Sequence, residues 1–136
     1  MSTAIGVAWG SGAPVTALLG DLTLLHDASG LVVGPLEPRP DVRFVVVNDD
    51  GGSIFSTFEQ GAPGHAVSFD RVFGTPQGVR VQGLADAAGL PYRRVRTAVD
   101  LRAALARPPA GLELVEVVLD RTRRRTFDEA VRGLVR

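Results

Sequence analysis

Residues 42–47, VRFVVV, form a nearly continuous apolar run that is closed by Asn48 and the pair Gly51–Gly52. A second apolar run, VTALL at residues 15–19, is closed in the same way by Gly20 and the aspartate that follows it. Short apolar runs bounded by turn residues are typical of strands that are buried on both faces of a parallel sheet. We therefore predict two parallel strands, each of which ends in a flexible, acidic turn.

The segment between the two runs predicts a helix. Residues 22–34, LTLLHDASGLVVG, carry apolar side chains at a spacing compatible with a helix, and a proline-rich turn follows at residues 35–40. The apolar positions are Leu24, Leu25, Leu31 and Val32. Together these segments form one strand–helix–strand unit.

The rest of the chain continues this alternation. We expect a short helix that begins just after Gly52 and includes Ile54, a helix at 79–88 stopped by Gly89, a strand at 92–95, a helix at 98–106, a strand at 112–120 and a terminal helix at 126–135. Residues 60–78 are rich in Gly, Pro and Ser and predict a long surface loop. The alternation predicts an α/β fold with a doubly wound, mostly parallel sheet. The length favours a single domain over residues 1–136.

Composition excludes several classes of partner and site. The 15 basic residues, all Arg, balance 15 acidic ones, so no overall field attracts nucleic acid or an anionic membrane. The chain has no Cys, which excludes disulfides and thiolate metal sites and agrees with a reducing compartment. No apolar run approaches the roughly 18 residues that span a bilayer. We expect a cytoplasmic protein that binds neither nucleic acid nor membrane.

Acidic residues follow both predicted strands. Asp21 comes directly after Gly20, and Asp49 comes directly after Asn48. Ligands of such sheets bind beyond the carboxyl ends of the strands, and Mg²⁺ is commonly held by one or two carboxylates together with phosphate oxygens. Glycines at 20, 51 and 52 let the backbone approach a ligand closely. These residues suggest a metal-bridged diphosphate site, although ordinary turns use the same residue types and are the more common explanation.

The paired segments GDLTLLHD (20–27) and VVNDDGGSIF (46–55) resemble the signature of thiamine-diphosphate enzymes, a Gly-Asp pair followed by an Asn-rich turn. This version is similar to 2-succinyl-5-enolpyruvyl-6-hydroxy-3-cyclohexene-1-carboxylate synthase, a decarboxylating carboligase of menaquinone biosynthesis. Nearly the whole chain takes part in the resemblance. Further segments similar to actinobacterial members are STAIG (2–6), EPRP (37–40), FEQGAP (58–63) and RVFGTP (71–76).

The resemblance implies a role for individual residues. The side chains of Asp21 and Asp49 and the main-chain carbonyl of Gly51 would coordinate Mg²⁺, and the diphosphate would complete the shell. Thiamine diphosphate would contact Gly20, Asp21, Leu22, Thr23, Asn48 and Gly52, and the substrate would contact Ile54 and Phe55. Asp49 stands where the wider pattern most often has Asn. The second charge should strengthen Mg²⁺ binding but repel diphosphate more.

The resemblance also implies an incomplete catalyst. The family joins 2-oxoglutarate to isochorismate, and the glutamate that activates the cofactor lies in a separate N-terminal domain. We therefore expect a C-terminal fragment, truncated at its N-terminus near a helix that contains Met1, without catalytic residues of its own and inactive alone. The family's active sites form between subunits, so we expect a homo-oligomer and self-association of the isolated chain.

Two alternatives stay open. In the first, the chain belongs to another thiamine-diphosphate carboligase or decarboxylase, similar to acetolactate synthase. In the second, it is a non-catalytic α/β assembly module that uses these turns structurally. The segments GGSIF (51–55) and EQGAP (59–63) favour the menaquinone enzyme over the first alternative.

Four other features have simpler explanations. We expect the pair His26–Asp27 to serve helix packing, because sequence neighbours on a helix do not face each other. His65 is expected to be solvated, and Trp9 to pack. Arg121 and Arg123–Arg125 are expected to form a solvated or inter-subunit surface, because no aromatic residues are interleaved with them.

Overall fold

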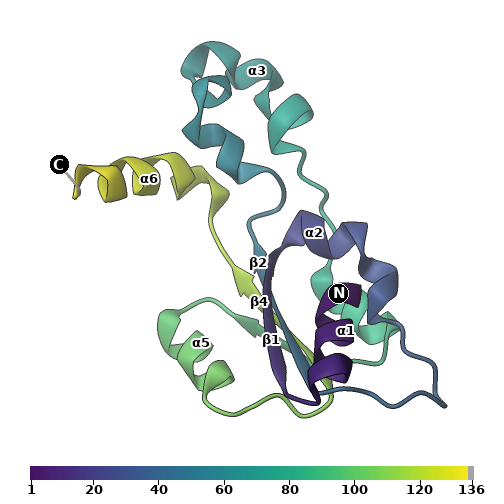
Figure 1. The fold of residues 1–136 in the computed structure, drawn as a ribbon. Coiled ribbons are helices and arrows are strands. Elements are labelled where there is room, and N and C mark those ends of the chain that lie inside the picture. Colours follow the sequence, from purple (N-terminus) through teal and green to yellow (C-terminus); the bar gives the residue numbers. More distant parts are fainter. Residues whose placement is uncertain (135–136) are drawn as a thin grey trace. The chain divides into compact units, whose positions relative to one another are not determined.

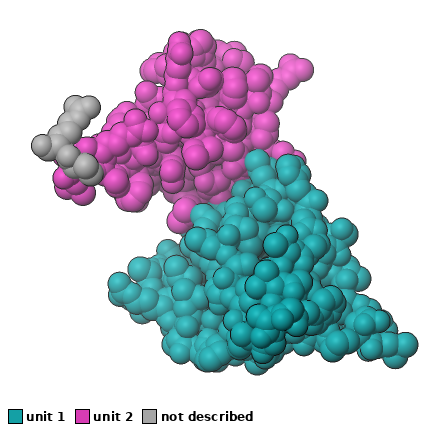
Figure 2. Space-filling model, in the orientation of Figure 1, with its two compact units in different colours: residues 1–48, 80–118 teal, residues 49–79, 119–136 magenta. Residues whose placement is uncertain are grey.

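The computed structural model describes residues 1–134, which divide into two compact units (Figure 2). Unit 1 comprises residues 1–48 and 80–118, and unit 2 comprises residues 49–79 and the described part of 119–136. That residues 1–136 form a single domain stays a prediction.

Unit 1 is built on a four-stranded, all-parallel sheet in the order β1-β2-β4-β3 (Figure 1). The strands are β1 (Val15–Gly20), β2 (Val42–Asn48), β3 (Tyr92–Val95) and β4 (Leu112–Val118). The central pair, β2 and β4, is buried along most of its length, as expected for strands covered on both faces. The predicted α/β fold with a doubly wound parallel sheet is therefore confirmed.

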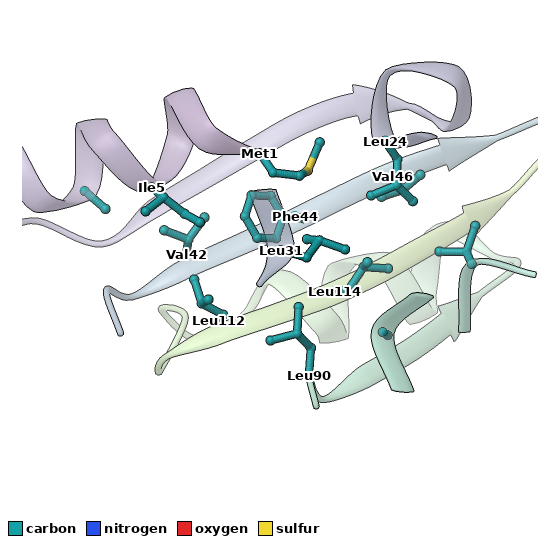
Figure 3. Packing of buried hydrophobic residues seen from close by; sticks show 13 residues of the cluster. Met1, Ile5, Leu24, Leu31, Val42, Phe44, Val46, Leu90, Leu112 and Leu114 are labelled. Atoms are coloured by element: carbon teal, nitrogen blue, oxygen red, sulfur yellow. The ribbon is translucent and has the colours of Figure 1, made fainter. Parts of the chain in front are cut away.

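One face of the sheet carries the larger core. It is covered by α1 (Ser2–Ser11), α2 (Asp21–His26) and α4 (Val81–Ala87), which contribute side chains such as Ile5 and Leu24. Phe44 and Leu114 project from the central strands into this cluster and are almost completely buried (Figure 3). Burial of such side chains stabilises the fold by about 1.5–3 kcal/mol each. This core holds β1 and β2, the strands that carry the predicted site, in a fixed register.

The opposite face packs against α5 (Ala98–Leu105). Ala104 of this helix contacts Val95 and Val115 of the sheet. Thr97 caps the helix by accepting a hydrogen bond from the Asp100 amide at 3.1 Å, a common way to satisfy a first-turn donor. The predicted helix at 98–106 is confirmed, one residue shorter at its end.

Two elements have boundaries that differ from the predicted ones, the helix after β1 and the strand β4. The helix after β1 begins at Asp21, three residues before the first apolar position used to predict it, and it gives way at Asp27 to a 3-10 turn, η1 (Ala28–Leu31). β4 ends at Val118 instead of Asp120. The reason is that the Asp120 carboxylate accepts a hydrogen bond from the Thr122 amide at 3.0 Å and begins the turn η6 (Arg121–Arg123).

Unit 2 corrects most of the predicted surface loop at residues 60–78. Up to Gly74 the chain forms successive short helical turns: η3 (Glu59–Gly61), η4 (Pro63–His65), α3 (Ala66–Phe69) and a π-helical turn η5 (Asp70–Gly74). Residues 75–78 form neither helix nor strand, as predicted. Each turn is too short to show a helical period in the sequence. The rings of Phe55 and Phe69 lie 5.9 Å and 6.3 Å from the ring of Phe73, which gives the turns an apolar centre.

Two further helices of unit 2 were predicted. The short helix that includes Ile54 is confirmed as a 3-10 turn, η2 (Ser53–Thr57). The terminal helix α6 (Arg124–Gly133) begins two residues before its predicted start at Thr126. Its predicted end at Val135 lies outside the described residues.

Candidate cofactor site

The register of β1 and β2 places two predicted site residues at one edge of the sheet. Gly20 lies opposite Val47, so Asp21 and Asn48, the next residues along each chain direction, emerge together at the carboxyl ends of adjacent strands. This is the edge at which ligands of open α/β sheets bind. Asp49 is joined directly to Asn48 and begins unit 2, which also contains Gly51.

Asp21 begins α2 and its side chain is buried, with the whole residue 8% exposed. Gly20 is the N-cap and has extended backbone, and a Cβ added to it would meet no atom of the described residues within 4 Å. The first turn of a helix leaves its amides without intrahelical acceptors, and here that turn contains Leu22 and Thr23. The edge therefore offers open space beside a glycine, a carboxylate and amide donors.

Asn48 is held by a residue that the sequence analysis did not single out. Its Nδ2 donates to Glu116 Oε1 at 2.6 Å, and Glu116 on β4 is only 3% exposed. The same carboxylate accepts a hydrogen bond from the Tyr92 hydroxyl and lies 3.3 Å from Arg94 Nε. Burial, together with the hydrogen bond to Glu116, raises the pKa of Tyr92 to about 12. A buried glutamate must find hydrogen-bond or charged partners. The position of Glu116 within an apolar strand was therefore the feature of the sequence that could have indicated such a contact.

The turn after Asn48 is held by contacts with other residues of unit 2. Asp49 accepts a hydrogen bond from the Ser53 hydroxyl. Gly51 has φ 126°, and a Cβ there would come within 2.1 Å of the Gly74 carbonyl oxygen, so only glycine fits. The Gly52 amide donates to that same carbonyl at 2.7 Å. The chain itself thus uses the Gly52 amide, and a contact of Gly52 with a cofactor stays a prediction.

The two predicted substrate contacts lie in η2 of unit 2. Ile54 is 52% exposed and Phe55 is 41% exposed. One side of Phe55 packs on Phe73, which fixes the ring, while the remaining surface of both residues is open. Their contact with substrate stays a prediction.

The arginine cluster of unit 2 corrects one expectation. Arg121 donates from Nη2 to Asp70 Oδ1 at 2.7 Å and from Nη1 to the Asp50 carbonyl at 3.3 Å. Arg125 donates to the carbonyl of Ser56 at 2.9 Å. These two side chains are therefore internal ties between the segments 49–79 and 119–134, and not simply a solvated or inter-subunit surface. The partners of these arginines are distant in sequence, so the run of arginines alone could not predict the contacts.

Other predicted roles have mixed outcomes. Asp27 accepts hydrogen bonds from the Met1 ammonium at 2.5 Å and the Ser2 amide at 2.8 Å, which is a structural role. These hydrogen bonds lower the pKa of Asp27 to about 2, and the one from the Met1 ammonium has the largest effect. His26, the other member of the pair expected to serve helix packing, is exposed. His65 is exposed, as expected. Trp9, expected to pack, is instead 50% exposed and donates from Nε1 to the Pro38 carbonyl at 3.2 Å.

Residues 1–134 include no group of three or more His, Cys, Asp or Glu side chains placed to hold a metal ion. A Mg²⁺ ion bound by two carboxylates would need its other oxygens from the main chain, a ligand or water. In the same part of the chain, every helix is too short or too polar to cross a membrane.

Comparison with known proteins identifies relatives for the whole sequence, although no family model matches it. The chain is 51% identical over 136 residues to 2-succinyl-5-enolpyruvyl-6-hydroxy-3-cyclohexene-1-carboxylate synthase of Saccharopolyspora erythraea, covering 100% of this chain and 24% of that protein. It is 53% identical over 144 residues to the same-named synthase of Thermobifida fusca, covering 100% of this chain and 25% of that protein. In each case the similarity is confined to one segment of the synthase.

The resemblance to the synthase that was predicted from the paired motifs is therefore confirmed. The Nocardioides synthase gives the same result, with 49% identity over 98% of this chain and 25% of its own length. The chain spans about a quarter of the length of the synthases it matches.

A solved structure shows the same fold. Benzoylformate decarboxylase from Polynucleobacter necessarius matches with a TM-score of 0.65 and 21% sequence identity. The match covers 87% of this chain and 23% of the decarboxylase. At this identity, the likeness supports the α/β architecture alone.

Proposed function

We propose that the chain is the Mg²⁺- and thiamine-diphosphate-binding part of a 2-succinyl-5-enolpyruvyl-6-hydroxy-3-cyclohexene-1-carboxylate synthase. The observation that carries the proposal is that 98–100% of this chain matches about a quarter of each of three synthases at 49–53% identity. The whole enzyme decarboxylates 2-oxoglutarate and adds the succinyl semialdehyde unit to isochorismate in menaquinone biosynthesis, in the cytoplasm.

In this proposal Asp21, Asp49 and the Gly51 carbonyl hold Mg²⁺. The register of β1 and β2 supports it, because it brings Asp21 and Asn48 to one edge and Asp49 follows Asn48 in the chain. The amides of Leu22 and Thr23 would donate hydrogen bonds to the diphosphate. The open space beside Gly20 lets the diphosphate approach that backbone.

Bound thiamine diphosphate supplies the electron sink that allows a 2-oxo acid to lose carbon dioxide. The residues of this chain bind and orient the cofactor through its diphosphate. Glu116 fixes the Asn48 amide beside the start of the metal-binding turn. Ile54 and Phe55 present exposed apolar surface that would exclude water from one side of the substrate.

Two further properties belong to the proposal. The isolated chain carries out no carboligation, because it spans about a quarter of the synthases it matches. The whole enzyme is at least a homodimer. A turnover assay with 2-oxoglutarate and isochorismate tests the first property, and measurable product from the 136-residue chain would contradict it.

Calorimetric titration of thiamine diphosphate into the chain, with and without Mg²⁺, tests cofactor binding. We expect binding that requires Mg²⁺ and is lost in Asp21→Ala and in Asp49→Ala. Asp86→Ala is the matched control, because Asp86 is an exposed carboxylate on α4. Binding that is independent of Mg²⁺, or equally strong in all variants, would contradict the metal assignment.

The same titration tests one of the two alternatives. A non-catalytic assembly module would show no binding of thiamine diphosphate in any form of the chain. Another thiamine-diphosphate enzyme, such as an acetolactate-synthase-like carboligase, would bind the cofactor equally well, but the shared name of the three relatives favours the menaquinone enzyme.

A further inference from the structure

Asp50 follows the predicted metal ligand Asp49 and has an uncommon backbone conformation. Its φ of 58° lies in the left-handed region, which non-glycine residues seldom adopt and which Asn and Asp adopt most readily. In the part of the chain that the structure describes, Asp50 shares a positive φ with one other non-glycine residue, Thr75. Such conformations persist only where the surrounding contacts hold them. The contacts of Asp50 therefore show what holds this turn.

The Asp50 carboxylate accepts hydrogen bonds from the backbone of a distant segment. Its Oδ1 accepts from the Gln77 amide at 3.1 Å and from the Gly78 amide at 2.9 Å, 27 and 28 positions further along the chain. The Gln77 side chain in turn donates from Nε2 to the Thr75 carbonyl at 2.7 Å. Hydrogen bonds to an ionised acceptor are stronger than those between neutral groups. The side chain of Asp50 thus ties its turn to the segment 75–78 of the same unit.

The main chain of the turn is held on both sides of Gly51. Before it, the Asp50 carbonyl accepts a hydrogen bond from Arg121 Nη1 at 3.3 Å. After it, the Gly52 amide donates to the Gly74 carbonyl at 2.7 Å. Because Gly51 lies between these two contacts, they restrict the orientation of its peptide group, including the carbonyl that is proposed to bind Mg²⁺.

We propose that Asp50 is a positioning residue for the metal site. Its hydrogen bonds to the segment 77–78 hold the turn in the conformation that presents Asp49 and the Gly51 carbonyl to Mg²⁺ together. Asp50 does not bind the ion itself and acts through the backbone. Metal binding and the anchoring of residues 77–78 therefore stabilise each other, since such coupling is reciprocal. This inference rests on the proposed function.

The size of the effect follows from the population of the correctly formed turn. A protein whose binding-competent state is only partly populated binds its ligand more weakly in proportion to that fraction. If loss of the anchor leaves the turn correctly formed in about one molecule in ten, Mg²⁺ binds about tenfold more weakly.

Titration of Mg²⁺ into the chain at a fixed concentration of thiamine diphosphate, followed by calorimetry, tests the role of Asp50. Asp50→Ala removes the acceptor, and Asp50→Gly removes it while tolerating the positive φ. Both should weaken Mg²⁺ binding about tenfold. Asp50→Asn keeps an acceptor oxygen and the tolerance of this conformation. It should restore binding to within about threefold of the unmodified chain, the remainder reflecting a weaker, neutral acceptor.

Asp41→Ala is the matched control. Asp41 Oδ1 accepts a hydrogen bond from the Gly111 amide at 2.6 Å, across 70 positions of the sequence. This contact is of the same kind as those of Asp50, but it lies in unit 1, just before the first residue of β2. The predicted site lies at the other end of that strand. Asp41→Ala should therefore leave Mg²⁺ affinity unchanged.

Hydrogen exchange in the unmodified chain gives a second readout, which decides the matter even where a variant folds poorly. Addition of Mg²⁺ and thiamine diphosphate should slow exchange of the Gln77 and Gly78 amides more than that of the Gly111 amide. Unchanged Mg²⁺ affinity in Asp50→Ala, an equal loss in Asp50→Asn, or no selective slowing at residues 77–78 would overturn the inference. An unmodified chain that binds no thiamine diphosphate with Mg²⁺ would instead contradict the proposed function, and the inference with it.

Discussion

The side-chain amide of Asn48 donates to the buried carboxylate of Glu116 at 2.6 Å, which links the last residue of β2 to the neighbouring central strand. The chain turns toward the predicted metal ligand Asp49 at the next peptide bond. Glu116 therefore fixes the point at which the turn begins, without itself being a predicted ligand.

Replacing Glu116 with Gln should lower the free energy of unfolding by about 1.5–3 kcal/mol, because hydrogen bonds to a charged group are lost. Chemical denaturation measures this change. Glu37→Gln, at an exposed position, serves as the control and should change stability little. Equal stability of the two variants would show that the Asn48–Glu116 pair contributes nothing to the fold.

Tyr92 should titrate near pH 12, because its burial and its hydrogen bond to Glu116 raise its pKa to about 12 from 10.0. It is the one tyrosine of the sequence, so absorbance at the phenolate band reports it alone. Since the folded-state pKa is raised, its stabilising effect is complete below pH 10 and is lost as the pH rises toward 12. Tyr92→Phe should remove this pH dependence, and a midpoint near 10 in the folded chain would refute the assigned environment.

Asp27 should make stability depend on acid pH. Its pKa is lowered from 3.8 to about 2, mainly by the hydrogen bond from the Met1 ammonium. Its contribution is therefore present above pH 4 and is lost as the pH falls toward 2. We expect Asp27→Asn to have a lower Tm at pH 7 and a flatter Tm profile between pH 4 and 2. Identical profiles for Asp27→Asn and the unmodified chain would rule out this contribution.

The pair Arg43–Glu113 lies inside the sheet, with Arg43 Nε donating to Glu113 Oε1 at 2.7 Å and both residues buried. Glu113→Ala should destabilise unit 1 by about 3–5 kcal/mol, because it leaves a buried guanidinium without its counter-charge. The double variant Arg43→Met, Glu113→Met should recover most of that loss. Urea unfolding of both variants tests this, and a double variant no more stable than Glu113→Ala would contradict it.

Strands β1 and β2 could be predicted because their sequences carry a local signal. The runs at 15–19 and 42–47 are apolar on both faces and end in glycine and acidic residues, and the observed strands differ from them by a single residue. The edge position of Asp21 and Asn48 then followed from parallel topology. The coordination of a metal by Asp21 and Asp49 stays a prediction.

Residues whose role depends on distant contacts could not be placed in this way. Arg121 meets Asp70 across 51 positions of sequence, and Glu116 meets Asn48 across 68. Residues 60–74 failed for a different reason, since their turns are stabilised by contacts among Phe55, Phe69 and Phe73 and have no period of their own. Local pattern thus predicts the strands, whereas the turns depend on contacts between residues apart in sequence, both polar and aromatic.

The strand order has a consequence for how the chain folds. β2 pairs with β4, and Val42 lies opposite Leu112, 70 residues further along. During synthesis β1 and β2 emerge early, but one edge of β2 lacks its partner until β4 has also emerged. Pairing across such a separation slows folding, and an apolar strand edge that waits for its partner is prone to pair with another chain. We therefore expect yields of correctly folded protein to depend on the rate of translation between residues 48 and 112.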